Sequence, residues 1–140
     1  MKVEVFTIGR PRLGFVRAGV EEYAKRLKRY ANFAWHPVAD EARLLARSQG
    51  ALRVALDERG EEPTTDELAE RVRRWRLTGV KRVAFLVGGA EGHSRALLGA
   101  ADWTMALSRL TLQHELALLL LLEQLYRVET LLAGHPYHRG

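Results

Sequence analysis

The sequence contains no cysteine, which excludes a disulfide scaffold, a thiolate metal cage and a cysteine nucleophile. Long hydrophobic runs are also missing. The longest, residues 116–122, is far shorter than the roughly 20 residues that a membrane-spanning helix requires. The N-terminus alternates polar and apolar residues and shows no signal-peptide core. We therefore expect a soluble, cytoplasmic protein that is not bound to a membrane.

Lysine is scarce as well, because only four of the 22 cationic residues are lysines and the rest are arginines. Against 17 acidic residues the chain keeps a net charge of +5. This balance favours a polyanionic partner such as RNA, although many basic surfaces bind nothing in particular. With 140 residues, 47% of them hydrophobic, the chain can bury one core but is too short for two. Residues 1–140 are expected to form a single domain.

The hydrophobic pattern predicts strands and helices in alternation. A first strand contains Val3, Val5 and Ile8, and a first helix presents an apolar face from Val16 to Tyr30. Further strands are predicted at 33–38, 52–57, 82–87 and 103–107, and further helices at 41–48, 64–79, 94–101 and 114–132.

The segment from residue 52 to residue 87 carries the clearest signal. Thr64 and Glu67 form a capping box at the start of a helix. The strand at 82–87 is almost wholly apolar, which indicates that both of its faces are covered. Strand, helix and strand within about 35 residues make a βαβ unit with parallel strands. We predict an α/β fold, a three-layer sandwich around a mostly parallel five-stranded sheet.

Ligands of open α/β sheets bind beyond the carboxyl ends of the strands. Three segments follow predicted strands in this way: 57–63, 88–93 and 108–113. The second begins with Gly88-Gly89 and includes Gly92, which permits positive φ and close approach of a ligand to the backbone. A tight turn without a ligand explains these glycines equally well. Their spacing is not that of a dinucleotide or P-loop site.

Residues 71–82 contain six cations and no acid. Together with the first helix they are candidates for a surface that contacts phosphates. The alternative is a solvated helix face, because cations also suit a helix C-terminus.

The C-terminal tail gathers His135, Tyr137, His138 and Arg139 directly after a very apolar helix. The helix would give these polar groups a fixed anchor, although a frayed terminus is the commoner outcome. Two histidines without a neighbouring carboxylate or thiolate are too few ligands for zinc, so no metal site is expected.

Four motifs resemble those of the RlmH family, formerly called YbeA, of the SPOUT superfamily of methyltransferases. They are residues 86–92 (LVGGAEG), 107–114 (LSRLTLQH), 125–127 (LYR) and 135–139 (HPYHR). The similarity runs from the first strand to the last residue and is strongest after Leu52. It implies that the last strand and helix form a deep trefoil knot, whose loops hold S-adenosyl-L-methionine. Positions 90 and 113 are prolines in the family but Ala90 and Gln113 here, and the segment 40–50 is shorter than usual.

The resemblance also implies which residues bind the cofactor. They lie in the three segments that follow the predicted strands, as topology alone suggests. These residues are Leu56, Gly88, Gly89, Ser108, Arg109, Leu110, Thr111, Leu112 and Gln113.

The implied reaction is methylation of N3 of pseudouridine 1915 in 23S rRNA, on the assembled 70S ribosome. Family members are homodimers, in which the tail of one subunit would complete the active site of its partner. Because N3 carries a proton, we expect His138, or else His135, to accept it. Arg139 would hold a phosphate or a uracil oxygen, and Tyr137 would stack on the base.

The apolar final helix, predicted at 114–132, offers an interface for such a dimer. Its apolar residues Leu118, Leu121, Leu122 and Leu125 exceed what one small core needs.

Two other functions fit part of the sequence. A non-catalytic basic RNA-binding or ribosome-assembly domain explains the charge but not the glycine loop and the polar tail. A SPOUT methyltransferase that acts on tRNA is the nearer alternative.

Overall fold

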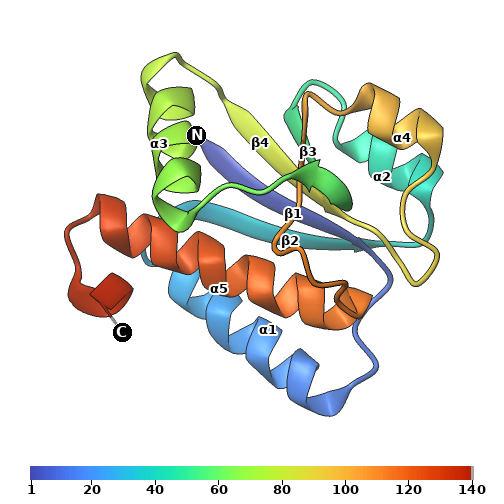
Figure 1. Cartoon of the computed structure of the whole chain (residues 1–140), viewed down its shortest axis with the longest axis horizontal. Coiled ribbons are helices and arrows are strands. Elements are labelled where there is room, and N and C mark those ends of the chain that lie inside the picture. Colours follow the sequence, from blue (N-terminus) through green and yellow to red (C-terminus); the bar gives the residue numbers. More distant parts are fainter. Residues whose placement is uncertain (140) are drawn as a thin grey trace.

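Five strands alternate with helices along the chain (Figure 1), as the hydrophobic pattern predicts. The computed structural model describes residues 1–139, with the side chains of His138 and Arg139 left outside the description. The elements are β1 (Lys2–Ile8), α1 (Gly14–Leu27), β2 (Asn32–Val38), α2 (Glu41–Arg47), β3 (Leu52–Glu61), α3 (Thr65–Leu77), β4 (Arg82–Val87), α4 (Arg95–Ala100), β5 (Trp103–Met105), α5 (His114–Leu132) and the 3₁₀ turn η1 (Pro136–Arg139).

The strands form one sheet in the order β2-β1-β4-β3-β5, and each neighbouring pair is parallel. The predicted βαβ unit is confirmed, because β3 and β4 pair side by side with α3 as their crossover. All parallel strands point their carboxyl ends toward the same edge of the sheet. Segments distant in sequence therefore meet there.

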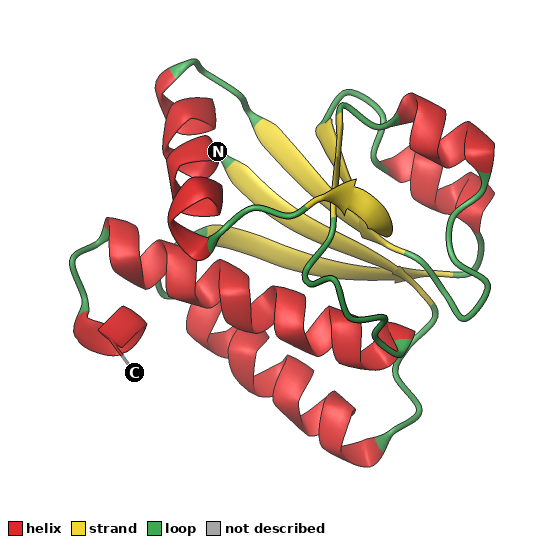
Figure 2. Cartoon of the chain, in the orientation of Figure 1, coloured by secondary structure: helices red, strands yellow, loops and turns green. Residues whose placement is uncertain are grey.

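Helices cover both faces of the sheet, which confirms the three-layer prediction (Figure 2). One face packs against α1, α3 and α5, around fully buried Val5 and Phe85. The other face packs against α2 and α4, which contribute Leu44 and Leu97. The strand predicted to be covered on both faces, β4, is the central strand of the sheet, between β1 and β3.

Helix caps follow the local sequence closely. Thr64 accepts the backbone N–H of Glu67, and the Glu67 carboxylate accepts that of Thr64, which confirms the capping box. At the start of α5 the cap is Gln113, whose side-chain oxygen accepts the N–H groups of Glu115 and Leu116. Its side chain thus satisfies two backbone N–H groups at the start of the helix.

The strand boundaries differ from prediction around β3 and β5. β3 extends to Glu61 instead of ending at residue 57, and β5 is only three residues long. Leu56 and Glu61 both lie opposite Met105, so the residues between them bulge out of the sheet. At Gly60 the two backbones are so close that a Cβ would lie 2.6 Å from the carbonyl of Thr104. Only glycine allows this approach.

The prediction that four leucines of the final helix form a dimer interface is wrong. Leu118, Leu121, Leu122 and Leu125 are all buried in the core of this chain, because α5 packs on the sheet between α1 and α3. The exposed apolar side chains of this region are others. They are Leu13, Phe15 and Leu120.

The described part of the chain has no helix that is both long and apolar enough to cross a membrane. The trefoil knot stays a prediction that follows from the family resemblance.

Candidate functional site

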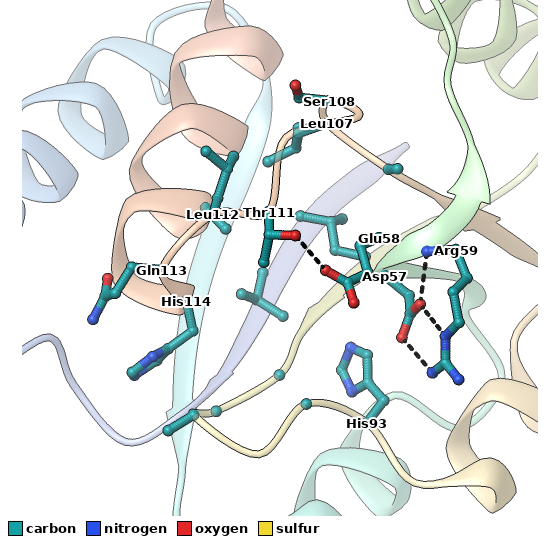
Figure 3. Close-up of a pocket in the computed structure, with 18 of the residues that line it drawn as sticks. Asp57, Glu58, Arg59, His93, Leu107, Ser108, Thr111, Leu112, Gln113 and His114 are labelled. Carbon is teal, nitrogen blue, oxygen red and sulfur yellow. Dashed lines mark hydrogen bonds and ion pairs between the residues drawn. The ribbon is translucent and has the colours of Figure 1, made fainter.

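A cavity of about 650 Å³ opens at the carboxyl ends of β3, β4 and β5 (Figure 3). It lies where the three segments singled out by topology meet, between the residues after β3, the glycine loop after β4 and the loop between β5 and α5. Its lining includes Leu56, Asp57, Glu58, Arg59, Val87, Gly88, Gly89, Ala90, Glu91, Gly92, His93, Ala106, Leu107, Ser108, Leu110, Thr111, Leu112, Gln113, His114 and Ala117.

The glycine loop is both a tight turn and a wall of the cavity. The N–H of Gly92 donates to the carbonyl of Gly89 at 3.0 Å, and Gly92 has a φ of 76°. A Cβ at Gly88 would lie 3.0 Å from the carbonyl carbon of Gly92, so the two limbs of the turn touch. The glycines therefore fold the loop on itself and keep its backbone at the cavity surface. The tight turn is therefore present, and its backbone lines the cavity in which the other interpretation places a ligand.

The β3 side of the cavity is polar. Asp57 accepts two hydrogen bonds from the Arg59 guanidinium, at 2.9 and 3.0 Å, and one from its backbone N–H. The guanidinium lowers the pKa of Asp57, so this side chain is an anion at neutral pH. Glu58 accepts the hydroxyl hydrogen of Thr111 at 3.0 Å and thereby joins β3 to the loop before α5.

The loop between β5 and α5 supplies the opposite wall. The Ser108 hydroxyl accepts the N–H of Leu110 at 3.0 Å, which turns the chain and leaves Leu110 74% exposed at the cavity. Arg109 is the exception among the predicted cofactor residues, since it is absent from the lining. Its side chain is 89% exposed and pairs with Glu62, with 3.4 Å between Nε and Oε1.

To the predicted segments and Leu56 the structure adds the lining residues Val87, Ala106, Leu107, His114 and Ala117. His93 donates its Nε2–H to the carbonyl of Leu86 at 2.9 Å, and its ring lies on the same side of the cavity as Asp57. His93 is the last residue of the predicted segment 88–93, and His114 directly follows the segment 108–113. Ala117, one helical turn beyond Gln113, carries no signal in the sequence.

The C-terminal tail lies at the other end of α5 from this cavity (Figure 1). A helix of 19 residues spans about 28 Å. Tyr137 packs against the side of α5, where its hydroxyl meets Tyr23 and Glu123. The Nδ1 of His135 accepts the backbone N–H of Tyr137 at 3.2 Å. The side chains of His138 and Arg139 lie outside the described residues. The structure therefore keeps the tail of a chain apart from its own cavity.

Comparison with known proteins identifies the family. A family model described as "Predicted SPOUT methyltransferase" matches residues 1–138. The chain belongs to this family of SPOUT methyltransferases.

Relatives of this SPOUT methyltransferase share its full length. A Thermus thermophilus protein called "Ribosomal RNA large subunit methyltransferase H" is 55% identical over 99% of both chains. A protein of the same name from Deinococcus radiodurans is 40% identical and matches over the whole of both chains.

Solved structures show the same fold at lower identity. A probable methyltransferase from Bordetella pertussis Tohama I has a TM-score of 0.60, with 17% identity over 91% of this chain and 95% of the other. The SpoU methyltransferase AviRb from Streptomyces viridochromogenes, solved in complex with AdoMet, has a TM-score of 0.51. It is also 17% identical, over 91% of this chain and 57% of the other.

Several cations of the SPOUT methyltransferase's segment 71–82 are used inside the molecule. Arg82 donates from Nε to the buried carboxylate of Glu4 at 2.8 Å, and Arg76 pairs with buried Glu129 at 2.5 Å. Arg73 and Arg74 both pair with Glu70, just outside the segment, and Arg71 stacks over Trp103 at 3.8 Å. Because these cations already have partners within the chain, the contacts favour a helix face without a ligand over a surface reserved for phosphates.

Proposed function

We propose that this SPOUT methyltransferase acts as a homodimer that methylates N3 of pseudouridine 1915 in 23S rRNA, on assembled 70S ribosomes in the cytoplasm. S-adenosyl-L-methionine would be its methyl donor, and residues 1–140 would act as one domain. The observation that carries the proposal is the cavity at the carboxyl ends of β3, β4 and β5. It is lined by the loops that the family resemblance assigns to the cofactor, in a chain 55% identical to a protein named as an rRNA methyltransferase.

The cavity suits this cofactor in size and in chemistry. Small-molecule sites have volumes of roughly 300–1,000 Å³, and this one measures about 650 Å³. Apolar side chains such as Leu56, Leu107 and Leu112 fit an adenine ring, and the glycine loop exposes backbone groups for hydrogen bonds. Carboxylates at Asp57 and Glu58 suit a cationic ligand. When bound, the cofactor supplies an electrophilic methyl group.

The residues of the chain then have two tasks: to hold the target base in line, and to take up the proton of N3. We assign the second task to His138. His135 ranks behind it, because its Nδ1 already accepts the N–H of Tyr137 and the neutral ring then carries its proton on Nε2. Arg139 would hold a phosphate or a uracil oxygen.

A dimer brings these two sets of residues together. Because the tail of each chain lies about 28 Å of helix away from its own cavity, it would serve the cavity of the partner subunit. Leu13 and Phe15 at the start of α1, and Leu120 on α5, which packs against α1, are exposed apolar side chains that suit a subunit interface.

Transfer of tritium from methyl-labelled cofactor tests the function. The acceptors are 70S ribosomes lacking the modification, separated subunits, naked 23S rRNA and bulk tRNA. The proposal predicts label in 23S rRNA from assembled ribosomes only, with mass spectrometry placing the methyl group on pseudouridine 1915. Label in tRNA would indicate a different SPOUT substrate. No label and no cofactor binding would leave a basic RNA-binding domain.

A further inference from the structure

The Tyr137 hydroxyl lies in a hydrogen-bond chain that joins the tail to two helices. It donates to Oε1 of Glu123 in α5 at 3.3 Å, and the hydroxyl of Tyr23 in α1 lies 2.9 Å away. Because Tyr137 gives its own hydrogen to Glu123, it accepts that of Tyr23. The phenol has thus used both its donor and one acceptor position within this chain.

Neighbouring side chains hold this arrangement in place. Arg127 donates to Glu123 from Nε and Nη2, at 3.0 and 2.6 Å, and its guanidinium lies 5.0 Å from the centre of the Tyr137 ring. The Tyr126 ring meets that of Tyr137 edge-on, 4.6 Å between centroids. Aromatic and cationic neighbours therefore already pack against the ring, which a nucleobase would otherwise have to contact.

The end of α5 turns the chain toward these groups. Gly134 has a φ of 75°, and the N–H of His135 donates to the carbonyl of Thr130 at 2.8 Å. This is the pattern of a Schellman cap, in which a left-handed residue reverses the chain after a helix. The reversal returns Tyr137 to the surface shared by α1 and α5.

We infer that Tyr137 is a positioning residue: Tyr23 and Glu123 hold its hydroxyl, and this contact fixes the point from which residues 138 and 139 extend to the partner's cavity. The inference rests on the proposed function. It replaces the expectation that Tyr137 stacks on the target base, and it gives Tyr23 and Glu123 a part in catalysis without contact with substrate.

Two single variants separate positioning from contact with the base. Tyr137→Phe removes the hydroxyl and keeps the ring on Tyr126, whereas Tyr23→Phe removes only the partner hydroxyl, from a helix that contributes no residue to the cavity lining. One hydrogen bond is worth about fivefold in rate, so each variant should lower kcat by about fivefold. The double variant should be no slower than Tyr137→Phe alone, because that variant already breaks the contact with Tyr23. The KM for the cofactor should not change.

Tyr30→Phe is the matched control. Tyr30 packs on Tyr126 and His135 through its ring, so loss of its hydroxyl should leave kcat at the wild-type value. If Tyr137→Phe lowers kcat while Tyr23→Phe does not, Tyr137 acts on the substrate and the inference is wrong. The inference is equally wrong if both variants keep full activity. A wild-type protein inactive on every acceptor would instead overturn the proposed function.

Absorbance of tyrosinate provides a readout that is independent of activity. Burial above all, together with the Glu123 carboxylate that accepts its hydrogen, raises the pKa of Tyr137 well above the usual value for tyrosine. A pH titration of the folded protein should therefore show one of the four tyrosines ionising late, and only when Tyr137 is present. Glu123→Gln should move this late ionisation to lower pH, because it removes the negative charge that opposes the phenolate. An unchanged titration would contradict the hydrogen bond on which the inference depends.

Discussion

Glu115 accepts the backbone N–H of Leu13 at 2.9 Å, although 102 positions of sequence separate the two residues. The same carboxylate accepts the N–H of Arg12 at 3.0 Å. Glu115 lies in the first turn of α5, the helix that follows the cavity loop, and Leu13 precedes α1. The contact therefore fixes the start of α5, and with it one wall of the cavity, to the loop after β1.

This contact predicts a specific acid sensitivity. Hydrogen bonds from Leu13 and Arg12 lower the pKa of Glu115. A lowered pKa in the folded state stabilises the protein above the unfolded pKa of about 4.3, and this contribution disappears as the pH falls through the folded pKa. Glu115→Gln should lower the urea midpoint by a clear margin at pH 7 and flatten its decline below about pH 4.3. Glu21→Gln, the same change on the exposed side of α1, should do neither. Parallel pH profiles for wild type and Glu115→Gln would contradict the role of this carboxylate.

Gly60 is predicted to tolerate no side chain. A Cβ there would lie 2.6 Å from Thr104 and 2.7 Å from the nitrogen of Met105, all backbone atoms that cannot rotate away. Gly60→Ala should therefore reduce the free energy of unfolding by about 2–3 kcal/mol, measured by urea denaturation. Gly99→Ala is the control, since nothing lies within 4 Å of a Cβ in that part of α4. It should stabilise the protein by about 0.5–1 kcal/mol. Equal effects at the two positions would refute the close approach of β3 and β5.

Arg76 is predicted to matter for stability because it faces a buried acid. Its partner Glu129 is buried on α5, and removing the guanidinium would leave that carboxylate unpaired. Arg76→Met should cost about 3 kcal/mol, whereas Arg74→Met, at a side chain 71% exposed, should change little. A double variant Arg76→Met/Glu129→Met should recover most of the loss. Calorimetric or urea unfolding of the three variants measures this, and equal stability of Arg76→Met and wild type would contradict it.

The glycine loop is predicted to control cofactor binding. A Cβ at Gly88 would press on the backbone of Gly92 at 3.0–3.1 Å, so Gly88→Ala must open the turn that walls the cavity. We expect affinity for S-adenosyl-L-methionine to fall about tenfold by calorimetric titration. Gly14→Ala, at the start of α1 with no neighbour within 4 Å, should bind like the wild type. Unchanged binding by Gly88→Ala would place the cofactor elsewhere.

The sequence predicted those features that depend on local patterns. The capping box at Thr64, the βαβ unit and the three segments after the strands follow from periodicity, caps and turns, and they are found in the structure. What it could not provide are contacts between distant residues. No local pattern around Tyr23 or Glu123 predicts their contact with Tyr137. Likewise, no pattern around Arg82 predicts its ion pair with Glu4.

For a related reason, the sequence does not show which side chains of α5 are buried within the chain. Leucines on every side of a helix show that the helix is apolar. They do not show whether a given side is covered by this chain (the sheet, α1 or α3) or by a second subunit. The structure assigns Leu118 and Leu122 to the core and leaves Leu120 exposed.

The central claim is that the cavity of one subunit and the tail of the other form one active site, and mixed dimers test it most directly. His138→Ala would lose the proton acceptor and keep the cavity, whereas Gly88→Val would lose the cavity and keep the tail. Each variant alone should transfer no methyl group to 70S ribosomes. After subunit exchange, followed by native mass spectrometry, the mixture should regain about a quarter of the wild-type rate, because half the dimers then hold one intact site. A mixture that exchanges subunits and stays inactive would contradict the shared site.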